Sequence, residues 1–287
     1  MEASKVSARK GNPAQIRSPE GKIFAKISGM AERFIVLLTD FGLKDHYVGV
    51  MKGVIAGICP EARVIDLTHE IPPQDVRAGA FVLGVSYRYF PEGSIFVGVV
   101  DPGVGTARRG LLLQAGSYYF VGPDNGLFSW VVKKEGCRQA VELTNRRYFR
   151  PEISRTFHGR DIFAPVAAHF ACGVPLREFG PEIQKLVMLP WPEVKKEGTI
   201  LKGAVIYVDR FGNLITNITE DMLRLPVKRI LYQGVEVPFL ETYGLAAPGE
   251  PLALIGSEGF LEIAVAGGSA ARRLGTDGEV VVEFSTP

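Results

Sequence analysis

The sequence lacks several features that identify common classes of protein. Its 287 residues include only three cysteines, Cys59, Cys137 and Cys172, which are widely spaced and form no CxxC pair. This usage predicts neither a disulfide framework nor a cysteine-based zinc site, and we expect Cys59 and Cys172 to be packed thiols in a reducing cytoplasm. No HExxH motif occurs, and the four histidines do not have zinc-site spacing, so we predict no metal ligands.

Long apolar runs and an excess of one charge are also missing. No run approaches the ~18 residues that a transmembrane helix requires. The 33 basic and 31 acidic residues give a formal net charge of +2, far from the basic excess of a nucleic-acid-binding protein. We therefore expect neither a membrane nor a nucleic acid as partner. A hydrophobic content of 46% with 22% charged residues also excludes wholesale disorder.

Residues 1–32 differ from the rest of the chain. They are rich in Ser, Lys, Arg, Gly and Ala, show no sustained hydrophobic period, and lack the continuous apolar segment of a secretory signal. We predict that they form a flexible tail outside the fold. Met30, just before the first apolar run, is an alternative start of translation.

The pattern from residue 33 to residue 189 predicts an α/β domain. Short apolar runs at 34–38, 63–67 and 95–100 are typical of strands that are buried on both faces. Helical periodicity follows the first run at 46–58, and Asp75 can N-cap a second helix. This alternation predicts a mainly parallel sheet with right-handed crossovers. Further predictions are a hairpin from two short strands, 111–113 and 118–121, and helices near 126–134 and 162–171.

The last third of the chain has a different texture. Pro190-Trp191-Pro192 and the charged residues after it predict a linker over 190–198. The segment 199–287 then contains short β-type runs separated by Gly, Pro and Asn rather than by long helices. This arrangement predicts an antiparallel sheet or small barrel, with strands at 203–208, 213–217, 229–232, 252–255, 261–266 and 279–284.

Three aspartates lie at or near the predicted carboxyl ends of strands, where open parallel sheets bind ligands. They are Asp40, Asp66 and Asp101. A lone Asp more often caps a turn or helix, but three together favour a polar pocket. Asp101 opens the glycine-bearing loop 101–109, whose spacing allows Arg108 to fold back toward Asp101. That pair either closes the loop structurally or belongs to a site.

Two further segments carry candidate chemistry. His158 lies in a glycine-bearing loop before a helix that Asp161 can cap. His169 has the position of a helical packing residue. His46 and His69 are candidates for capping or supporting groups. In the β-rich segment, Asp209 and Asn213 bracket a Phe-Gly turn. Such a turn is either an ordinary hairpin or a place where Asp binds a diol or ammonium and Asn binds a nucleobase edge. Phe211 and Tyr243 either pack in a core or cover a purine ring.

Seven short motifs occur in an order that resembles one protein family, the S-adenosyl-L-methionine (SAM) hydroxide adenosyltransferases, which are relatives of the SAM-dependent fluorinases and chlorinases. The resemblance runs from Phe34 to Phe284. The motifs are Thr39-Asp-Phe-Gly42, Asp66-Leu-Thr-His69, Asp101-Pro-Gly-Val-Gly-Thr106, Gly122-Pro-Asp-Asn-Gly126, Thr156-Phe-His-Gly-Arg-Asp161, Phe211-Gly-Asn213 and Glu241-Thr-Tyr-Gly244.

The resemblance implies an α/β/α sandwich followed by an antiparallel β-barrel-like domain, and hydrolysis of SAM to adenosine and L-methionine without a cofactor. It also implies a homotrimer whose sites lie between the N-terminal domain of one subunit and the C-terminal domain of its neighbour. The implied catalytic residues are Asp101, Arg108 and His158, and Asp40 corresponds to the ribose-binding carboxylate. The implied contacts to the adenine and methionine ends are Asp209, Phe211, Asn213, Tyr243 and Ser257.

Departures from the fluorinases indicate the hydroxide branch. Fluorinases have Tyr at the position of Asp101, a Tyr-Ser pair at His158-Gly159, and an aromatic residue over the ribose where this chain has Gln74. A carboxylate at Asp101 repels a halide ion. Two alternatives from other classes stay open at this point: a metal-dependent hydrolase of a nucleotide-like substrate, and a protein that binds SAM or adenosine without turnover.

Overall fold

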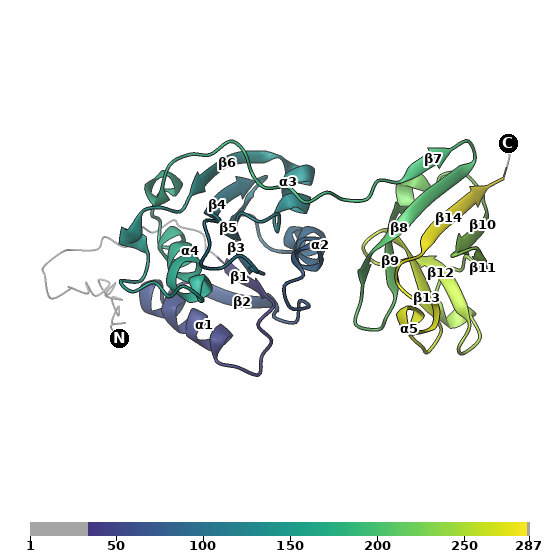
Figure 1. Cartoon of the computed structure of the whole chain (residues 1–287), viewed down its shortest axis with the longest axis horizontal. Helices are drawn as coiled ribbons and strands as arrows, with labels where there is room; N and C mark the ends of the chain where they lie inside the picture. The colour runs from purple at the N-terminus through teal and green to yellow at the C-terminus, as the bar shows by residue number, and fades with distance from the viewer. Residues whose placement is uncertain (1–33, 286–287) are drawn as a thin grey trace, which may run out of the picture. The chain divides into compact units, whose positions relative to one another are not determined.

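The structure, a computed structural model, describes residues 34–285. The predicted tail 1–32 and the alternative start at Met30 therefore lie outside the described residues. Two β-sheets make up the framework of the described chain (Figure 1).

The first sheet has six strands in the order β2-β1-β3-β5-β4-β6. Strands β1, β2, β3 and β5 are parallel to one another, and β4 runs antiparallel to both β5 and β6. The predicted parallel sheet and hairpin are thus confirmed. The strands are β1 (Phe34–Thr39), β2 (Arg63–Thr68), β3 (Ile95–Val99), β4 (Gly110–Ala115), β5 (Tyr118–Pro123) and β6 (Cys137–Glu142).

Helices cover both faces of this sheet, which confirms the α/β/α sandwich (Figure 1). Ile35 and Leu37 of β1 pack with α1 (Tyr47–Ile58) and α4 (Ala164–Ala171), whereas the alternate residues of β1 pack with α2 (Val76–Ser86) and α3 (Ser129–Glu135). Because both faces of such a strand are buried, apolar and polar residues do not alternate along it, and its sequence is a continuous apolar run. The Asp75 carboxylate accepts a hydrogen bond from the Ala78 amide at 2.9 Å, so it N-caps α2 as predicted.

Asp161 does not cap a helix, contrary to the prediction. Residues Gly159–Phe163 form a π-helical turn that continues directly into α4, and Asp161 lies inside this turn. Its buried carboxylate accepts hydrogen bonds from Arg160 Nε at 2.7 Å and from the Ser154 amide at 2.8 Å. The π turn places the carboxylate beside the preceding loop, a geometry that helical spacing alone does not reveal.

The prediction that Cys59 and Cys172 are thiols is also wrong, because the two residues form a disulfide with a Cα–Cα distance of 5.9 Å. Cys59 follows the last residue of α1 and Cys172 follows the last residue of α4. The packing of these two helices brings together residues that are 113 positions apart. Cys137 is free and exposed.

The second sheet is antiparallel and nearly closes into a barrel, as predicted. Its order is β11-β10-β14-β8-β9-β13-β12, with β7 paired to β8. An isolated bridge from Phe239 to Ala253 of β12 helps to close it. The strands are β7 (Lys195–Glu197), β8 (Ile200–Val208), β9 (Leu214–Thr219), β10 (Val227–Tyr232), β11 (Val235–Val237), β12 (Pro251–Ile255), β13 (Phe260–Val265) and β14 (Glu279–Phe284).

The remaining elements are short. Helix α5 (Ala270–Leu274) packs beside β13, and 3₁₀ turns occur at Tyr87–Tyr89, Arg146–Tyr148, Leu176–Phe179, Glu220–Met222 and Tyr243–Leu245. Strand β7 falls within the predicted linker 190–198, while the boundaries at 189 and 199 stay predictions. Between residues 34 and 285, each helix is too short or too polar to cross a membrane.

Candidate active site

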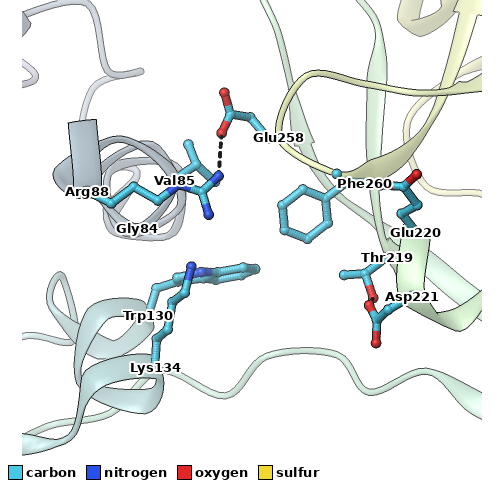
Figure 2. Close-up of a pocket in the computed structure, with 11 residues that line it drawn as sticks. Gly84, Val85, Arg88, Trp130, Lys134, Thr219, Glu220, Asp221, Glu258 and Phe260 are labelled. Carbon is cyan, nitrogen blue, oxygen red and sulfur yellow. Dashed lines mark hydrogen bonds and ion pairs between the residues drawn. The ribbon is translucent and has the colours of Figure 1, made fainter.

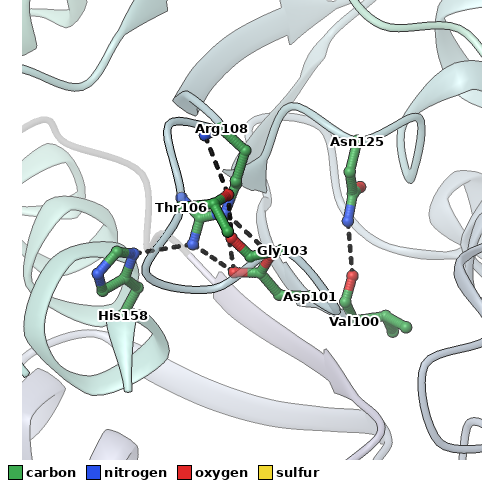
Figure 3. Close-up of polar contacts among 7 residues, drawn as sticks. All are labelled: Val100, Asp101, Gly103, Thr106, Arg108, Asn125 and His158. Carbon is green, nitrogen blue, oxygen red and sulfur yellow. Dashed lines mark hydrogen bonds and ion pairs between the residues drawn. The ribbon is translucent and has the colours of Figure 1, made fainter. Parts of the chain in front are cut away.

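Asp101, Arg108 and His158 form one hydrogen-bonded group at the carboxyl end of β3 (Figure 3). Arg108 Nε donates to the two Asp101 carboxylate oxygens at 2.9 and 3.0 Å, and Arg108 Nη2 donates to Asp101 Oδ2 as well. The same Nη2 lies 2.8 Å from His158 Nδ1. The Arg108 and Asp101 side chains are only 11% and 5% exposed. The three residues predicted as catalytic are therefore in direct contact.

The loop that carries Asp101 and Arg108 is built from consecutive tight turns. The Val104 amide donates to the Asp101 carbonyl at 3.2 Å, and Thr106 Oγ1 donates to the Gly103 carbonyl at 2.6 Å. Gly105 has a φ of +76°, and a Cβ there would lie 2.2 Å from the Arg155 carbonyl oxygen. Glycine is therefore required at this position both by the backbone conformation and by the close approach of Arg155. Together these turns reverse the direction of the chain, so that Arg108 contacts Asp101.

The contact with Arg108 determines the state of His158. A guanidinium group has only donors, so His158 Nδ1 must be the acceptor, and the proton of the neutral ring is then on Nε2. Burial and the charge of Arg108 lower the pKa of His158, and the nearby carboxylates of Asp101 and Asp161 oppose this shift only in part. His158 is therefore neutral at pH 7 and presents an N–H donor at Nε2.

Asp40 lies in the turn that follows β1, at the same edge of the sheet. Its Oδ2 accepts a hydrogen bond from the Gln74 backbone amide at 2.8 Å, and Gln74 has a φ of +66°. The Phe41 ring contacts the Phe157 ring at a centroid distance of 5.8 Å. This contact links the Asp40 turn to the segment that carries His158.

Asp66 belongs to a different group. Its carboxylate forms an ion pair with Lys52 at 2.6 Å and lies 3.0 Å from His69 Nε2. Burial acts to raise the pKa of Asp66, but the hydrogen bond from Lys52 and the nearby His69 ring outweigh it and lower the pKa. The other ring nitrogen of His69 lies 2.9 Å from Thr39 Oγ1, which identifies His69 as a supporting group below the Asp40 turn.

The C-terminal candidates cluster around the β8–β9 hairpin and the segments beside it. Asp209 accepts hydrogen bonds from both the backbone amide and the side-chain amide of Asn213, at 2.8 and 2.9 Å. Phe211, at the tip of this turn, is 76% exposed and so is not a core residue. Tyr243 donates its hydroxyl hydrogen bond to Glu262 Oε2 at 2.7 Å. Ser257 Oγ lies 3.5 Å from Glu258 Oε1.

Glu262 contacts the candidate residue Tyr243, and the sequence analysis did not single it out. It is buried on β13, and burial raises the pKa of its carboxyl group, with repulsion from Asp209 and Glu258 adding to the shift and the Tyr243 hydrogen bond opposing it. The available signal was a single acidic residue within the otherwise apolar run Phe260–Val265. The negative charges of Asp209 and Glu258 that act on Glu262 favour a ligand that carries positive charge.

The N-terminal and C-terminal candidates form two separate groups in the described part of the chain. Between residues 34 and 285, no hydrogen bond, ion pair or ring contact joins Asp40, Asp101, Arg108 or His158 to the C-terminal set. In the same span, no three His, Cys, Asp or Glu side chains gather as a potential metal site. Gln74 contacts the site through its backbone amide.

A pocket of about 320 Å³ lies elsewhere (Figure 2). Trp130 and Phe260 form apolar walls, and Arg88 Nη2 donates to Glu258 at 3.4 Å. None of the residues predicted as catalytic lines it. It is therefore separate from the Asp101–Arg108–His158 group.

Two family models match the chain in succession. Residues 35–180 match the SAM hydroxide adenosyltransferase N-terminal domain, and residues 203–283 match the C-terminal domain of the same family. The chain belongs to the SAM hydroxide adenosyltransferase family. The resemblance carried by the seven motifs is thereby confirmed.

Relatives of this chain include proteins named as hydrolases and, at lower identity, as fluorinases. The (R)-S-adenosyl-L-methionine hydrolase of Salinispora tropica is 44% identical over 245 residues, covering 84% of this chain and 94% of that protein. A fluorinase of Actinoplanes sp. is 30% identical over 267 residues, covering 80% and 90%. The crystal structure of an uncharacterized conserved protein from Thermotoga maritima superposes with a TM-score of 0.81 at 40% identity, covering 86% of this chain and 99% of that one.

Proposed function

We propose that this protein hydrolyses SAM to adenosine and L-methionine. The observation that carries the proposal is the Asp101–Arg108–His158 group at the carboxyl edge of the sheet, in a chain that is 44% identical to a named SAM hydrolase. The higher identity to this hydrolase than to the fluorinase, together with the carboxylate of Asp101, supports water rather than a halide as the nucleophile.

The chemistry requires activation of the nucleophile, not of the leaving group. The sulfonium of SAM leaves as a neutral thioether, so its departure needs neither a general acid nor a metal ion, and we propose that no added cofactor takes part. The oxygen of water forms a bond to C5′ while the C5′–S bond breaks and its electron pair returns to sulfur. The remaining task is to align this water and take its proton, and general-base catalysis of this kind contributes ~10²–10⁴-fold.

The geometry suggests a distinct task for each of the three residues. Nδ1 of His158 is occupied by Arg108 and Nε2 carries a proton, so His158 donates to the water oxygen and orients it. Asp101 keeps free lone pairs beside its bonds to Arg108, and we assign proton acceptance to it. The guanidinium of Arg108 stabilises the negative charge that develops on the attacking oxygen.

Substrate binding is assigned to the remaining candidates. Asp40 accepts hydrogen bonds from the ribose hydroxyls, next to the Gln74 backbone. Asn213 and the exposed rings of Phe211 and Tyr243 bind the adenine, while Asp209 and Ser257 bind the methionine end. The sulfonium and ammonium groups of SAM outweigh its one carboxylate, and the acidic surroundings of Asp209 favour such a cation.

We further propose a homotrimer in which a neighbouring subunit completes each site. Among residues 34–285, no hydrogen bond, ion pair or ring contact joins the two sets of candidate residues, and most of the Phe211 ring is exposed. In the proposed trimer the Phe211 ring packs against a neighbouring subunit. The C-terminal candidates of one subunit then lie beside Asp101, Arg108 and His158 of the next. The proposal includes a cytoplasmic location and no nucleic-acid or membrane partner.

The experiment is to incubate the purified protein with SAM, with and without a chelator, and to separate the products by chromatography. We expect stoichiometric adenosine and L-methionine in both samples. Loss of activity in the chelator points to a metal-dependent hydrolase, and binding that leaves SAM intact points to a non-catalytic protein. Either result contradicts the proposal.

A further inference from the structure

The dipeptide Asp124-Asn125 lies where the two ends of the Asp101–Arg108 loop come together. In the sheet order β3-β5-β4, strand β5 lies between the strand that leads into the loop and the strand that leaves it. The loop 101–109 therefore crosses the carboxyl end of β5, and Asp124 and Asn125 directly follow that end. The motif Gly122–Gly126 has no role in the chemistry described above.

Asn125 holds the entrance of the loop (Figure 3). Its Nδ2 donates to the carbonyl oxygen of Val100 at 2.8 Å, one residue before Asp101. Its Oδ1 accepts a hydrogen bond from the Leu127 amide at 3.2 Å, which fixes the orientation of the side-chain amide. The peptide group that presents Asp101 is thereby tied to the end of β5.

Asp124 holds the exit of the same loop. The Asp124 amide donates to the Arg109 carbonyl at 2.9 Å, and Arg109 Nε donates to Asp124 Oδ2 at 3.0 Å. The other carboxylate oxygen accepts from the Val187 amide at 2.8 Å. The Asp124 side chain is almost fully buried, so this contact is well shielded from water. Arg109 directly follows Arg108, so the exit of the loop is fixed one residue away from the guanidinium that holds Asp101.

We infer that Asp124 and Asn125 are positioning residues for the reaction, which set the relative placement of Asp101 and Arg108 without touching substrate. The inference rests on the proposed catalytic role of those two residues. Alignment of reacting groups is sensitive to displacement, and a shift of about 1 Å costs as much as ~10²-fold in rate. Substrate affinity is assigned to other residues, Asp40 among them, so loosening the loop lowers kcat more than it changes KM.

The chain contains a matched control in Asn145. Its Nδ2 donates to the Glu178 carbonyl at 2.7 Å and its Oδ1 accepts from the Arg147 amide at 3.2 Å. These are the contacts of Asn125 in type and length, and both side chains are half-buried, but neither hydrogen bond of Asn145 involves the 101–109 loop. Replacing either asparagine by alanine therefore deletes an equivalent pair of hydrogen bonds.

The test compares Asn125→Ala and Asn125→Asp with Asn145→Ala and Asn145→Asp, at a temperature at which circular dichroism shows every variant folded. We expect the Asn125 variants to lose about tenfold to hundredfold in kcat for adenosine formation, with KM for SAM within about twofold. The Asn145 variants keep kcat within about twofold of the parent. Asp124→Asn, which preserves shape and removes the charge, lowers kcat in the same direction.

Asp101→Asn is measured in the same series to separate two kinds of failure. If Asp101→Asn loses activity while folded Asn125 variants keep the parental kcat, the positioning role is wrong and the proposed site stands. An equal loss in the Asn145 variants also overturns it, because the effect is then general loosening. If Asp101→Asn keeps full activity, the proposed site is wrong and the positioning role fails with it.

Discussion

Arg108 Nη2 lies 2.8 Å from His158 Nδ1, and this contact makes His158 a neutral hydrogen-bond donor rather than a free base. Protonation of Nδ1 would place a proton between the ring and a guanidinium group that has no acceptor. The relationship separates the tasks of the two residues beside Arg108. It supports the proposed division of tasks, in which Asp101 takes the proton and His158 orients the water.

The first prediction concerns the titration of His158. We expect a pKa below 6.5 and the Nε2–H tautomer, both measurable by nitrogen NMR of the imidazole. Arg108→Met removes the repelling charge and raises this pKa. Between the lowered pKa and 6.5, His158 binds fewer protons in the folded state than in the unfolded state. Its contribution to the free energy of unfolding therefore falls as the pH decreases through this range. A pKa at or above 6.5 in the parent contradicts the assignment.

The second prediction concerns the disulfide. Reducing Cys59–Cys172, or replacing both residues by alanine, is expected to lower the free energy of unfolding by about 2–4 kcal/mol, because the bond closes a long segment of chain. Urea denaturation measures the change, and Cys137→Ala, which removes an exposed free thiol, is the control. Equal stability of the oxidised and reduced protein would show that the bond does not constrain the unfolded chain. A disulfide is uncommon in the reducing cytoplasm, so its state in cells also bears on the proposed location.

The third prediction concerns the contribution of Asp40 to SAM binding. Charge-assisted hydrogen bonds contribute ~1.5–3 kcal/mol each, so Asp40→Ala is expected to weaken SAM binding by roughly tenfold or more. Calorimetry measures the dissociation constant. Asp277→Ala, which removes an exposed carboxylate on the β10–β14 side of the second sheet, is the control and keeps the parental affinity. Parental affinity in Asp40→Ala means that Asp40 does not bind the ribose.

The fourth prediction concerns the shared site. Asp101→Ala and Asn213→Ala are each expected to inactivate the protein. In the proposed trimer, mixing the two variants creates some sites that combine an intact Asp101 from one subunit with an intact Asn213 from its neighbour. Activity is therefore expected to return in part after subunit exchange, which mass spectrometry of labelled subunits verifies. Verified exchange without recovered activity places each site within a single subunit.

The sequence was sufficient where a pattern is local. The continuous apolar runs of β1 and β3 predicted buried parallel strands, Asp75 predicted an N-cap, and the spacing from Asp101 to Arg108 allowed the pair that the structure contains. These features depend on residues close together in the chain. The catalytic and binding roles of the site residues stay predictions.

It was insufficient where distant segments meet or where a helical turn departs from regular α-helical spacing. The Cys59–Cys172 bond depends on how α1 packs against α4, and the buried position of Asp161 depends on a π turn. Asn125 was part of a quoted motif, but its hydrogen bond to Val100 depends on the sheet order β3-β5-β4. None of these relationships leaves a periodic signal in the sequence.

The most direct test of the central claim is to run the reaction in water enriched in oxygen-18 and to analyse the nucleoside by mass spectrometry. We expect adenosine that carries one heavy oxygen at C5′, together with unlabelled L-methionine, and loss of this product in Asp101→Asn. Adenine, methylthioadenosine, or adenosine without the label would contradict attack of water on C5′.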